Sequence, residues 1–360
     1  MVRLRFALGL MLLIANGCAV PRILPPPDLP HPHGVDCYVA AARVDLPVGL
    51  ANLIENPLSS AIPERGSTAP ARNILVLSGG GRDGAYSAGV LTGWSATGSR
   101  PSFDVVTGIS TGALIAPLAF LGTRYDKVLA ENYTSVHTED IYRKRPWPSL
   151  LWADSLADSS PLRRRIDAQI TDEFLAEIAH AHAAGRRLYV GTTNLHSGRL
   201  ILWDLGAIAS GTDSKKRELF RDVLLASCSI PGLLPPVPIE IEVDGKRYKE
   251  LHVDGGVSAS LFLTPYMALG ERRDMQTNVY VVVAGRLSST PQSVKPRLLA
   301  ISEGSLQKLL VTQTRTDLLR TYLLTRLVGG RFAVASVPPA LAISPDSTTF
   351  DLKDMRQLYD

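Results

Sequence analysis

Residues 73–91 read NILVLSGGGRDGAYSAGVL. The apolar run at the start of this stretch is typical of a buried strand, and the segment after the glycines has the pattern of a helix. Three consecutive glycines cost backbone entropy, but they keep the N–H groups of a loop free of side chains. Such a loop lets the backbone approach a phosphate, an oxyanion or another strand, and the stretch by itself leaves these three partners open.

Strand and helix patterns alternate downstream of this stretch. Strands are expected over 103–108, 187–195, 199–205 and 277–285, and helices over 84–94, 111–122, 172–185 and 302–327. A hairpin is expected around Asp244 and Gly245, because Asp-Gly favours a tight turn between two strands. The alternation predicts an α/β fold with three layers, α/β/α, around a mostly parallel central sheet.

The composition limits the partners of the chain. It has 360 residues, a net charge of +4 and a sequence pI near 8.9. No cluster of basic residues is interleaved with aromatic residues, so we do not expect the chain to bind nucleic acid. The mild excess of positive charge favours a weak attraction to anionic lipid surfaces.

The N-terminus has the layout of a secretory signal. Residues 1–20 read MVRLRFALGLMLLIANGCAV, in which two arginines precede an apolar run and a small residue stands directly before Cys18. The apolar run is shorter than the roughly 20 residues that span a bilayer. This order resembles a bacterial lipoprotein signal, so we expect residues 1–17 to be a signal peptide and Cys18 to carry a lipid. The alternative is an ordinary signal peptide with an incidental cysteine.

Residues 18–71 are expected to connect this anchor to one folded domain over 72–360. Proline-rich residues 21–33 favour an extended spacer, and the residues after them look irregular. The predicted location is the cell envelope, at the outer membrane or facing the periplasm, since alanine and not aspartate follows the lipidated cysteine. Cys37 and Cys228 either pair in that oxidising compartment or stay free.

The second decisive stretch is DVVTGISTGALIAPL, residues 104–118. It contains the pattern G-x-S-x-G between an expected strand and an expected helix, which is the context in which a nucleophilic serine occupies a sharp turn. Gly108 and Gly112 fit this elbow, because side chains at these positions would collide with the turn or with the helix. Ser110 is therefore a candidate nucleophile, and the alternative is a serine that only caps the helix.

A nucleophilic serine gives the glycine loop a partner, because acyl transfer forms an oxyanion that backbone N–H groups stabilise. Two rival interpretations are weaker. A phosphate-binding P-loop needs a lysine that this loop lacks, and a dinucleotide site needs an acidic residue at the end of a second strand, whereas Asp104 begins one. For the base, His252 and Asp254 compete, because both lie on one face of a strand that leads into a glycine-rich turn.

Several separated blocks resemble the patatin-like phospholipase family. They are GGGRDGAYSAG, GISTG, ASCSIPGLLPPV and VDGG, in the order and spacing of that family, with TTNLHSGRL, FDLKDMRQLYD and residues 158–166 as further blocks. The resemblance covers about residues 72–360. It implies a patatin-like fold and a catalytic dyad without histidine, in which Ser110 is the nucleophile and Asp254 the base. It also implies that Gly79, Gly80 and Gly81 form the oxyanion hole.

The activity implied by the resemblance is that of a serine acyl hydrolase, of the lipid esterase or phospholipase A type. The implied partners are a lipid or phospholipid substrate and a membrane surface, with no metal and no cofactor. The alternative is a non-catalytic protein that binds lipid or another protein on the same scaffold. The sequence leaves the oligomeric state open.

The glycine loop departs from the family pattern at two positions. The family commonly has Gly-Gly-Gly-x-Arg/Lys-Gly, whereas here Arg82 stands one place early and Asp83 occupies the usual place of the basic residue. This change leaves the backbone donors untouched. It puts in doubt any role of the basic side chain in screening a phosphate or in positioning the loop.

Three further features allow two interpretations each. Residues 142–152, YRKRPWPSLLW, form either a lid or patch that enters lipid, or a loop whose aromatic residues cover the core. The helix expected over 302–327 has a basic face, which we expect to face solvent while the helix packs on the domain. Ser227 and Ser229 are expected to belong to a structural turn that lines the pocket, because a proline follows them.

Overall fold

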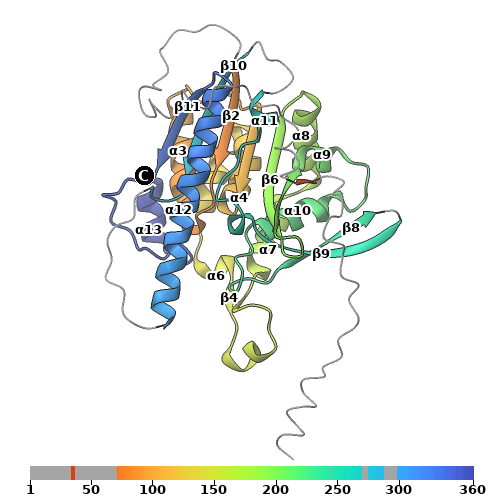
Figure 1. The fold of residues 1–360 in the computed structure, drawn as a ribbon, viewed down its shortest axis with the longest axis vertical. Helices are drawn as coiled ribbons and strands as arrows, with labels where there is room; N and C mark the ends of the chain where they lie inside the picture. The colour runs from red at the N-terminus through yellow and green to blue at the C-terminus, as the bar shows by residue number, and fades with distance from the viewer. Residues whose placement is uncertain (1–33, 37–70, 244, 270–274, 288–297) are drawn as a thin grey trace, which may run out of the picture.

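The fold is organised around a mixed sheet. The computed structural model describes residues 34–36, 71–243, 245–269, 275–287 and 298–360, and within them nine strands form one sheet in the order β1-β7-β6-β3-β2-β10-β11, with β9 paired to β6 and β8 to β9 (Figure 1). These strands are β1 (Gly34–Asp36), β2 (Ala71–Leu77), β3 (Val105–Ile109), β6 (Arg187–Asn194), β7 (Arg199–Asp204), β8 (Val237–Val243), β9 (Lys246–Asp254), β10 (Gln276–Val283) and β11 (Arg331–Ser336).

The strands β6, β3, β2, β10 and β11 run parallel, which confirms the predicted mostly parallel sheet. The pair β6–β7 is antiparallel, because only residues 195–198 connect the two strands and a parallel pair needs a crossover of about a dozen residues. The strands β8 and β9 form the expected hairpin, in which Val243 pairs with Lys246.

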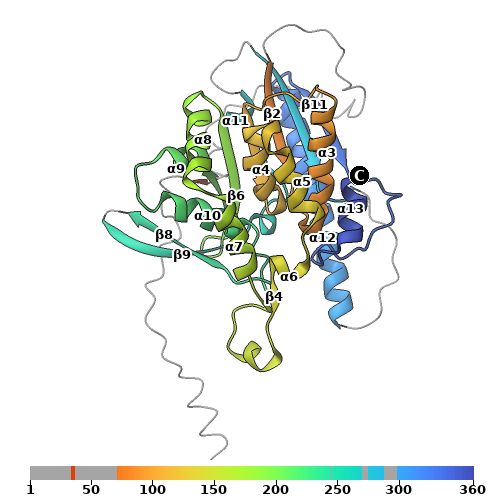
Figure 2. The ribbon, with the colours of Figure 1, turned by 180° about the vertical axis from the view of Figure 1, so that it is seen from behind.

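Helices cover both faces of the sheet, so the predicted three layers are confirmed (Figures 1 and 2). One face carries α3 (Gly84–Ala96), α4 (Thr111–Leu121), α5 (Asp126–Thr134), α7 (Ser160–Gln169), α8 (Asp172–Ala183), α9 (Leu205–Ser210), α10 (Lys216–Ser227) and α13 (Leu352–Tyr359); the other carries α11 (Pro265–Leu269) and α12 (Leu298–Leu327).

The strand β2 explains why its sequence is a continuous apolar run. Side chains of a strand alternate between the two faces of a sheet. Leu75 and Leu77 belong to the core under the first set of helices, while Ile74 and Val76 belong to the core that also holds Phe332. Because both faces are covered, every position from 74 to 77 is buried and apolar.

Most of the predicted N-terminal segment lies outside the described residues. The predicted signal peptide over 1–17, the lipidation site Cys18, and Cys37 are among them, so these expectations stay predictions. Residues Gly34–Asp36 form β1, antiparallel to β7, in a stretch that looks irregular in sequence because three residues are too few to show a period. In the described part of the chain, no helix is long and apolar enough to cross a membrane.

Three loops meet at one edge of the sheet. The glycine loop follows β2 after Leu77, Ser110 follows β3, and Asp254 ends β9, which is paired with the last residues of β6. The carboxyl ends of β2 and β3 lie side by side, since Leu77 pairs with Gly108. Ligands of open α/β sheets bind at this edge, so it is where a functional site is expected.

Candidate active site

Ser110 occupies a strained turn between β3 and α4. Its backbone has φ 53° and ψ −124°. Among the described residues, Ser110 is the only one other than glycine that has a positive φ. Such a conformation costs of order 1–3 kcal/mol and persists only when its surroundings hold it. The surroundings do so here, because the Ser110 N–H donates to Ser227 Oγ at 2.9 Å and the Cys228 thiol donates to the Ser110 carbonyl at 3.3 Å.

These contacts give Ser227 and Cys228 a structural explanation. Ser227 also donates from its hydroxyl to the Gly191 carbonyl at 2.8 Å, so it bridges the turn to β6. Burial raises the pKa of the Cys228 thiol, which therefore stays protonated near neutral pH and does not act as a nucleophile. The sequence indicated a structural turn here, but it did not indicate that this turn holds the backbone of Ser110.

The two glycines of the elbow lie where no side chain fits. A Cβ on Gly108 would lie 2.4 Å from the Gly112 carbonyl oxygen, and a Cβ on Gly112 would lie 2.6 Å from the Leu77 carbonyl oxygen. Both distances are far below ordinary contact distances. The elbow can therefore form only with glycine on either side of the central residues, as the sequence pattern suggested on steric grounds.

Asp254 lies beside Ser110 although the two residues are far apart in the chain. Its N–H donates to the Ser229 carbonyl at 2.9 Å, and its Oδ1 accepts from the Gly256 N–H at 2.7 Å, so the side chain is fixed at the end of β9. Burial raises the pKa of the Asp254 carboxyl to about 6, while the hydroxyl of Ser110 and the Gly256 N–H, both hydrogen-bonding to it, act in the opposite direction. The structure therefore brings together the serine and the carboxyl that the sequence singled out.

His252, the competing candidate base, is turned into a different buried network. Its Nδ1 lies 2.9 Å from Thr192 Oγ1 and its Nε2 lies 3.2 Å from Glu250 Oε2. Trp203 donates from its indole N–H to the same Thr192 oxygen at 2.8 Å, so the threonine hydroxyl is free to donate to Nδ1 and Nε2–H to donate to Glu250. Both ring nitrogens of His252 thus have partners away from Ser110.

The three glycines of the glycine loop approach three different segments. Gly79 lies against Ser110, with 3.1 Å from a notional Cβ to Ser110 Cβ, and a Cβ on Gly80 would lie 1.8 Å from the Ala284 carbonyl oxygen. Gly81 has φ +55°, and a Cβ there would lie 2.4 Å from the Ser347 carbonyl oxygen. Gly80 and Gly81 are thus required by close packing against Ala284, the residue after β10, and against Ser347.

The hydrogen bonds of this loop distinguish its N–H groups. The Gly79 N–H already donates to the Ser260 carbonyl at 2.9 Å, so it is not available to an oxyanion in this conformation. Among the described residues, no hydrogen bond of the Gly80 or Gly81 N–H is found. These two groups are the free N–H donors of the loop. Of the three glycines expected to form an oxyanion hole, Gly80 and Gly81 therefore have an available N–H group in this conformation.

Arg82 and Asp83 have a structural role that the sequence did not reveal. Arg82 is only 1% exposed; its guanidinium donates to Asp354 at 2.8 Å and to the Ser344 carbonyl at 2.8 Å, and it pairs with Asp83 at 3.3 Å. Its backbone N–H donates to the Ser347 carbonyl at 2.8 Å. Burial raises the pKa of Asp83 to about 6, against the opposing effect of Arg82. Arg82 therefore ties the glycine loop to residues 344–354.

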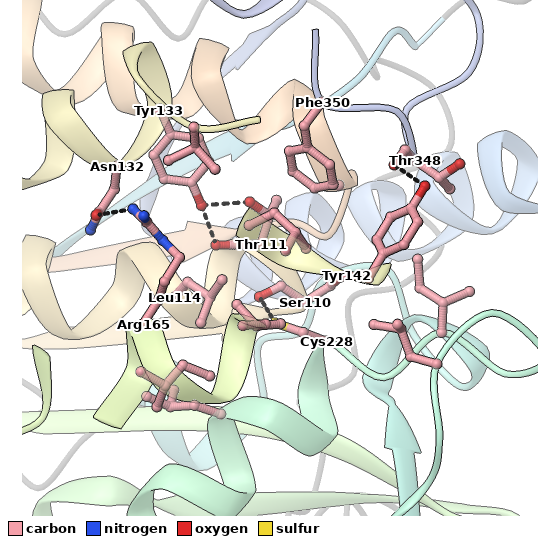
Figure 3. Close-up of a pocket in the computed structure, with 18 of the residues that line it drawn as sticks. Ser110, Thr111, Leu114, Asn132, Tyr133, Tyr142, Arg165, Cys228, Thr348 and Phe350 are labelled. Atoms are coloured by element: carbon pink, nitrogen blue, oxygen red, sulfur yellow. Dashed lines mark hydrogen bonds between the residues drawn. The ribbon is translucent and has the colours of Figure 1, made fainter. Parts of the chain in front are cut away.

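An apolar pocket opens beside Ser110. It has a volume of about 970 Å³ including its opening to solvent, and its walls include Leu114, Ile141, Tyr142, Leu162, Leu233 and Phe350. Arg165 and Asn132 lie together at one end of the pocket, hydrogen-bonded at 3.1 Å, away from Tyr142 and Thr348 (Figure 3). The pocket thus has an apolar body and one polar end.

The first helical residue after the serine is fixed from inside this pocket. The Tyr133 hydroxyl lies 2.6 Å from Thr111 Oγ1 and donates to the Thr111 carbonyl at 3.2 Å (Figure 3). Tyr133 comes from α5, so α5 holds the start of α4. Among the described residues, no group of three or more His, Cys, Asp or Glu side chains is arranged to hold a metal ion.

The model of one protein family matches this chain over residues 75–266, and its description is patatin-like phospholipase. The chain belongs to the patatin-like phospholipase family. The matched residues include the glycine loop, Ser110 and Asp254, whereas Ser344 and Asp354, the partners of Arg82, lie beyond them.

Two known proteins are similar to parts of this family member. A cUMP-AMP-activated phospholipase of Escherichia coli is 40% identical over 88 residues, which are 24% of this chain and 26% of that protein. The chain thus matches about a quarter of the length of that relative. The crystal structure of VipD from Legionella pneumophila aligns with 81% of this chain and 67% of its own, at 10% identity and a TM-score of 0.34.

Proposed function

We propose that this patatin-like protein is a serine acyl hydrolase that cleaves lipid esters with Ser110 as nucleophile and Asp254 as base. The observation that carries the proposal is the strained Ser110, which lies beside the buried Asp254 carboxyl and lines an apolar pocket. Membership in the patatin-like phospholipase family supports a lipid as substrate.

The proposed reaction has two steps. The Ser110 hydroxyl oxygen attacks the ester carbonyl while Asp254 accepts its proton, and the leaving alcohol takes that proton as the carbon–oxygen bond breaks. Water then attacks the acyl-enzyme while Asp254 accepts its proton, and this proton passes to the Ser110 oxygen as the bond to the acyl carbon breaks and the carboxylic acid leaves. A pKa of about 6 supports this role, because a carboxylate of raised pKa is a stronger base than a free aspartate and is still ionised at neutral pH.

The oxyanion is assigned to the N–H groups of Gly80 and Gly81, the free donors of the loop. The N-terminus of α4, which begins at Thr111, adds a partial positive charge next to the reacting serine. The apolar body of the pocket suits an acyl chain, because burying hydrocarbon there is favourable by roughly 25 cal/mol per Å².

Labelling by a fluorophosphonate tests the proposal directly. An activated serine displaces fluoride from the probe and forms a phosphonyl ester, so we expect the label on the peptide that contains Ser110. The label should be lost in Ser110→Ala and retained in Ser87→Ala, a buried serine whose hydroxyl has no hydrogen-bond partner among the described residues. An intact, folded chain that stays unlabelled would favour the non-catalytic alternative.

The pH dependence of hydrolysis follows from the raised pKa of Asp254. The base must be ionised, so kcat/KM for a soluble p-nitrophenyl ester is expected to fall on the acid side with an apparent pKa of about 6. Asp83 titrates in the same range, and Asp83→Asn separates the two groups. We expect the acid limb to persist in Asp83→Asn; its disappearance would transfer the titration to the glycine loop.

A membrane tether through Cys18 remains part of the proposal. It is supported by the order of arginines, apolar run and small residue before this cysteine. We expect Cys18→Ala to release the chain from the membrane fraction of the cells that produce it, and unchanged retention would count against lipidation.

A further inference from the structure

We propose that residues 143–158, here called the tryptophan loop, form a surface that docks the protein on anionic phospholipid bilayers with the pocket facing the lipid. The loop consists of β4 (Arg143–Lys144), the 3₁₀ helix Trp147–Leu151 and β5 (Ala157–Asp158). The inference rests on the proposed function only in its choice of lipid as the partner.

The aromatic residues of this loop do not cover the core. Trp147 is 80% exposed and Trp152 is 76% exposed, and Leu156 beside them is 56% exposed. Trp203 is buried and Trp94 is half-buried, so the exposure is confined to the tryptophans of this loop. The interpretation of a loop whose aromatic residues shield the core thus holds for Tyr142, which is buried, but not for Trp147 and Trp152, which are exposed to solvent.

The base of the loop is fixed to the body of the protein. Arg143 pairs with Asp158 and Lys144 with Ala157 in a two-stranded ribbon. The Leu156 N–H donates to the Gly232 carbonyl, and the N–H of the buried Ala157 donates to the Leu233 carbonyl, both at 2.8 Å. The loop projects from the body beside α6 (Thr138–Ile141), at the end opposite to α11 (Figures 1 and 2).

The base of the loop is continuous with the pocket. Ile141 and Tyr142, which directly precede it, line the pocket, and so does Leu233, to which its far end is bonded. The Tyr142 hydroxyl donates to the carbonyl of Thr348, another lining residue of the pocket, at 3.1 Å (Figure 3). A bilayer that receives the two tryptophans would thus lie close to the part of the pocket that Ile141, Tyr142 and Leu233 line.

The charges of the loop select an anionic surface. Arg145 lies 3.9 Å from Asp154, and Asp158 accepts from Ser160, so these charges have local partners. Arg143 and Lys144 are exposed and make no ion pair with the described residues. Tryptophan favours the interface between headgroups and hydrocarbon, and each basic residue close to an anionic bilayer adds affinity. Tryptophan and unpaired basic residues together match an anionic bilayer.

Tryptophan fluorescence tests the docking surface without any catalytic readout. The parent is the full-length chain with Cys18→Ala and Ser110→Ala, which removes acylation and hydrolysis. With phosphatidylcholine–phosphatidylglycerol vesicles we expect its emission to shift to the blue and to be quenched by brominated phospholipid. Both signals should be lost in Trp147→Ala/Trp152→Ala and retained in Tyr266→Ala, an exposed aromatic on α11 that is 58% exposed.

The charge contribution is tested by co-sedimentation with the same vesicles. Arg143→Ala/Lys144→Ala is expected to weaken binding roughly 25-fold, which corresponds to about 1 kcal/mol per basic residue. The matched control is Lys246→Ala/Arg247→Ala, two exposed basic residues on the β8–β9 hairpin, and it should bind like the parent. Binding of the parent to pure phosphatidylcholine should be weak, and salt should weaken binding to the anionic vesicles.

Three outcomes would overturn the docking surface. One is the absence of shift and quenching in the parent, and another is an equal loss in the control variants. The third is an emission that is already blue without vesicles, because the tryptophans would then be covered by another part of the chain or by a second copy.

The proposed function is tested separately: with Ser110 intact, Trp147→Ala/Trp152→Ala should turn over a soluble ester like the wild type. If the wild type shows no turnover while quenching persists, only the proposed function fails.

Discussion

Ser110→Ala is expected to lower hydrolysis of a short p-nitrophenyl ester by roughly 10⁵-fold while the protein stays folded. The loss follows from the proposed covalent step, because no other group among the described residues of the pocket replaces the hydroxyl that attacks the ester. Single-turnover and steady-state rates of purified protein measure the effect, and circular dichroism checks the fold. Ser87→Ala is the matched control and should keep full activity, since that buried hydroxyl has no hydrogen-bond partner among the described residues. Wild-type turnover in folded Ser110→Ala would contradict the mechanism.

A second substitution at the same position separates catalysis from strain. Ser110→Gly removes the hydroxyl as well, but glycine adopts φ 53° without the steric cost that any Cβ pays there. We expect Ser110→Gly to be as inactive as Ser110→Ala and more stable than it by roughly 1–2 kcal/mol in urea unfolding. Equal stability of the two variants would mean that the turn stores no strain.

The role of the base is decided by two isosteric or near-isosteric changes. Asp254→Asn is expected to lower kcat by roughly 10³-fold without loss of stability, because it removes the proton acceptor together with a buried charge. His252→Asn is expected to lower the melting temperature and leave kcat within a few-fold, because it disrupts the network of Thr192 and Glu250 and not the serine. The reverse pattern would make His252 the base.

The sequence predicted those parts of the fold in which the pattern of neighbouring residues matches the burial of their side chains. The run around Ile74 to Leu77 predicts a strand covered on both faces, and the pattern around Ser110 predicts an elbow, because steric exclusion acts between residues close in the chain. Asp254 was identified from its place at the end of a strand before two glycines, and from the family resemblance.

The parts that the sequence did not predict depend on contacts between distant segments. The Gly79 N–H is occupied by the carbonyl of Ser260, and nothing near position 79 in the sequence signals this partner. Likewise, Asp354, the second carboxylate partner of Arg82 besides the adjacent Asp83, lies 272 residues away in α13, beyond the reach of any periodicity. A buried arginine next to an aspartate in a glycine loop indicates that partners are needed, but not where they come from.

Arg82→Met is expected to lower both stability and activity. Removing the guanidinium leaves Asp354 and Asp83 without their shared partner and removes the hydrogen bond to the Ser344 carbonyl. Breaking a buried ion pair in this way lowers the free energy of unfolding by about 3 kcal/mol. In thermal unfolding this corresponds to a decrease of roughly 8 °C. Activity should fall as well, because the same residue holds the C-terminal segment against Gly81, one of the two free N–H donors.

Arg100→Met separates a positioning role from mere destabilisation. Arg100 is as buried as Arg82, with its side chain 2% exposed, and it pairs with Asp126 at 2.8 Å, but none of its contacts reaches the glycine loop. Both variants should unfold at lower temperature, and kcat measured well below either midpoint should fall only in Arg82→Met. A released C-terminal segment lets Gly81 leave the geometry that the oxyanion needs, so the loss should appear in kcat more than in KM. If Arg82→Met and Arg100→Met keep the same kcat, the link between Arg82 and residues 344–354 stabilises the fold without positioning the loop.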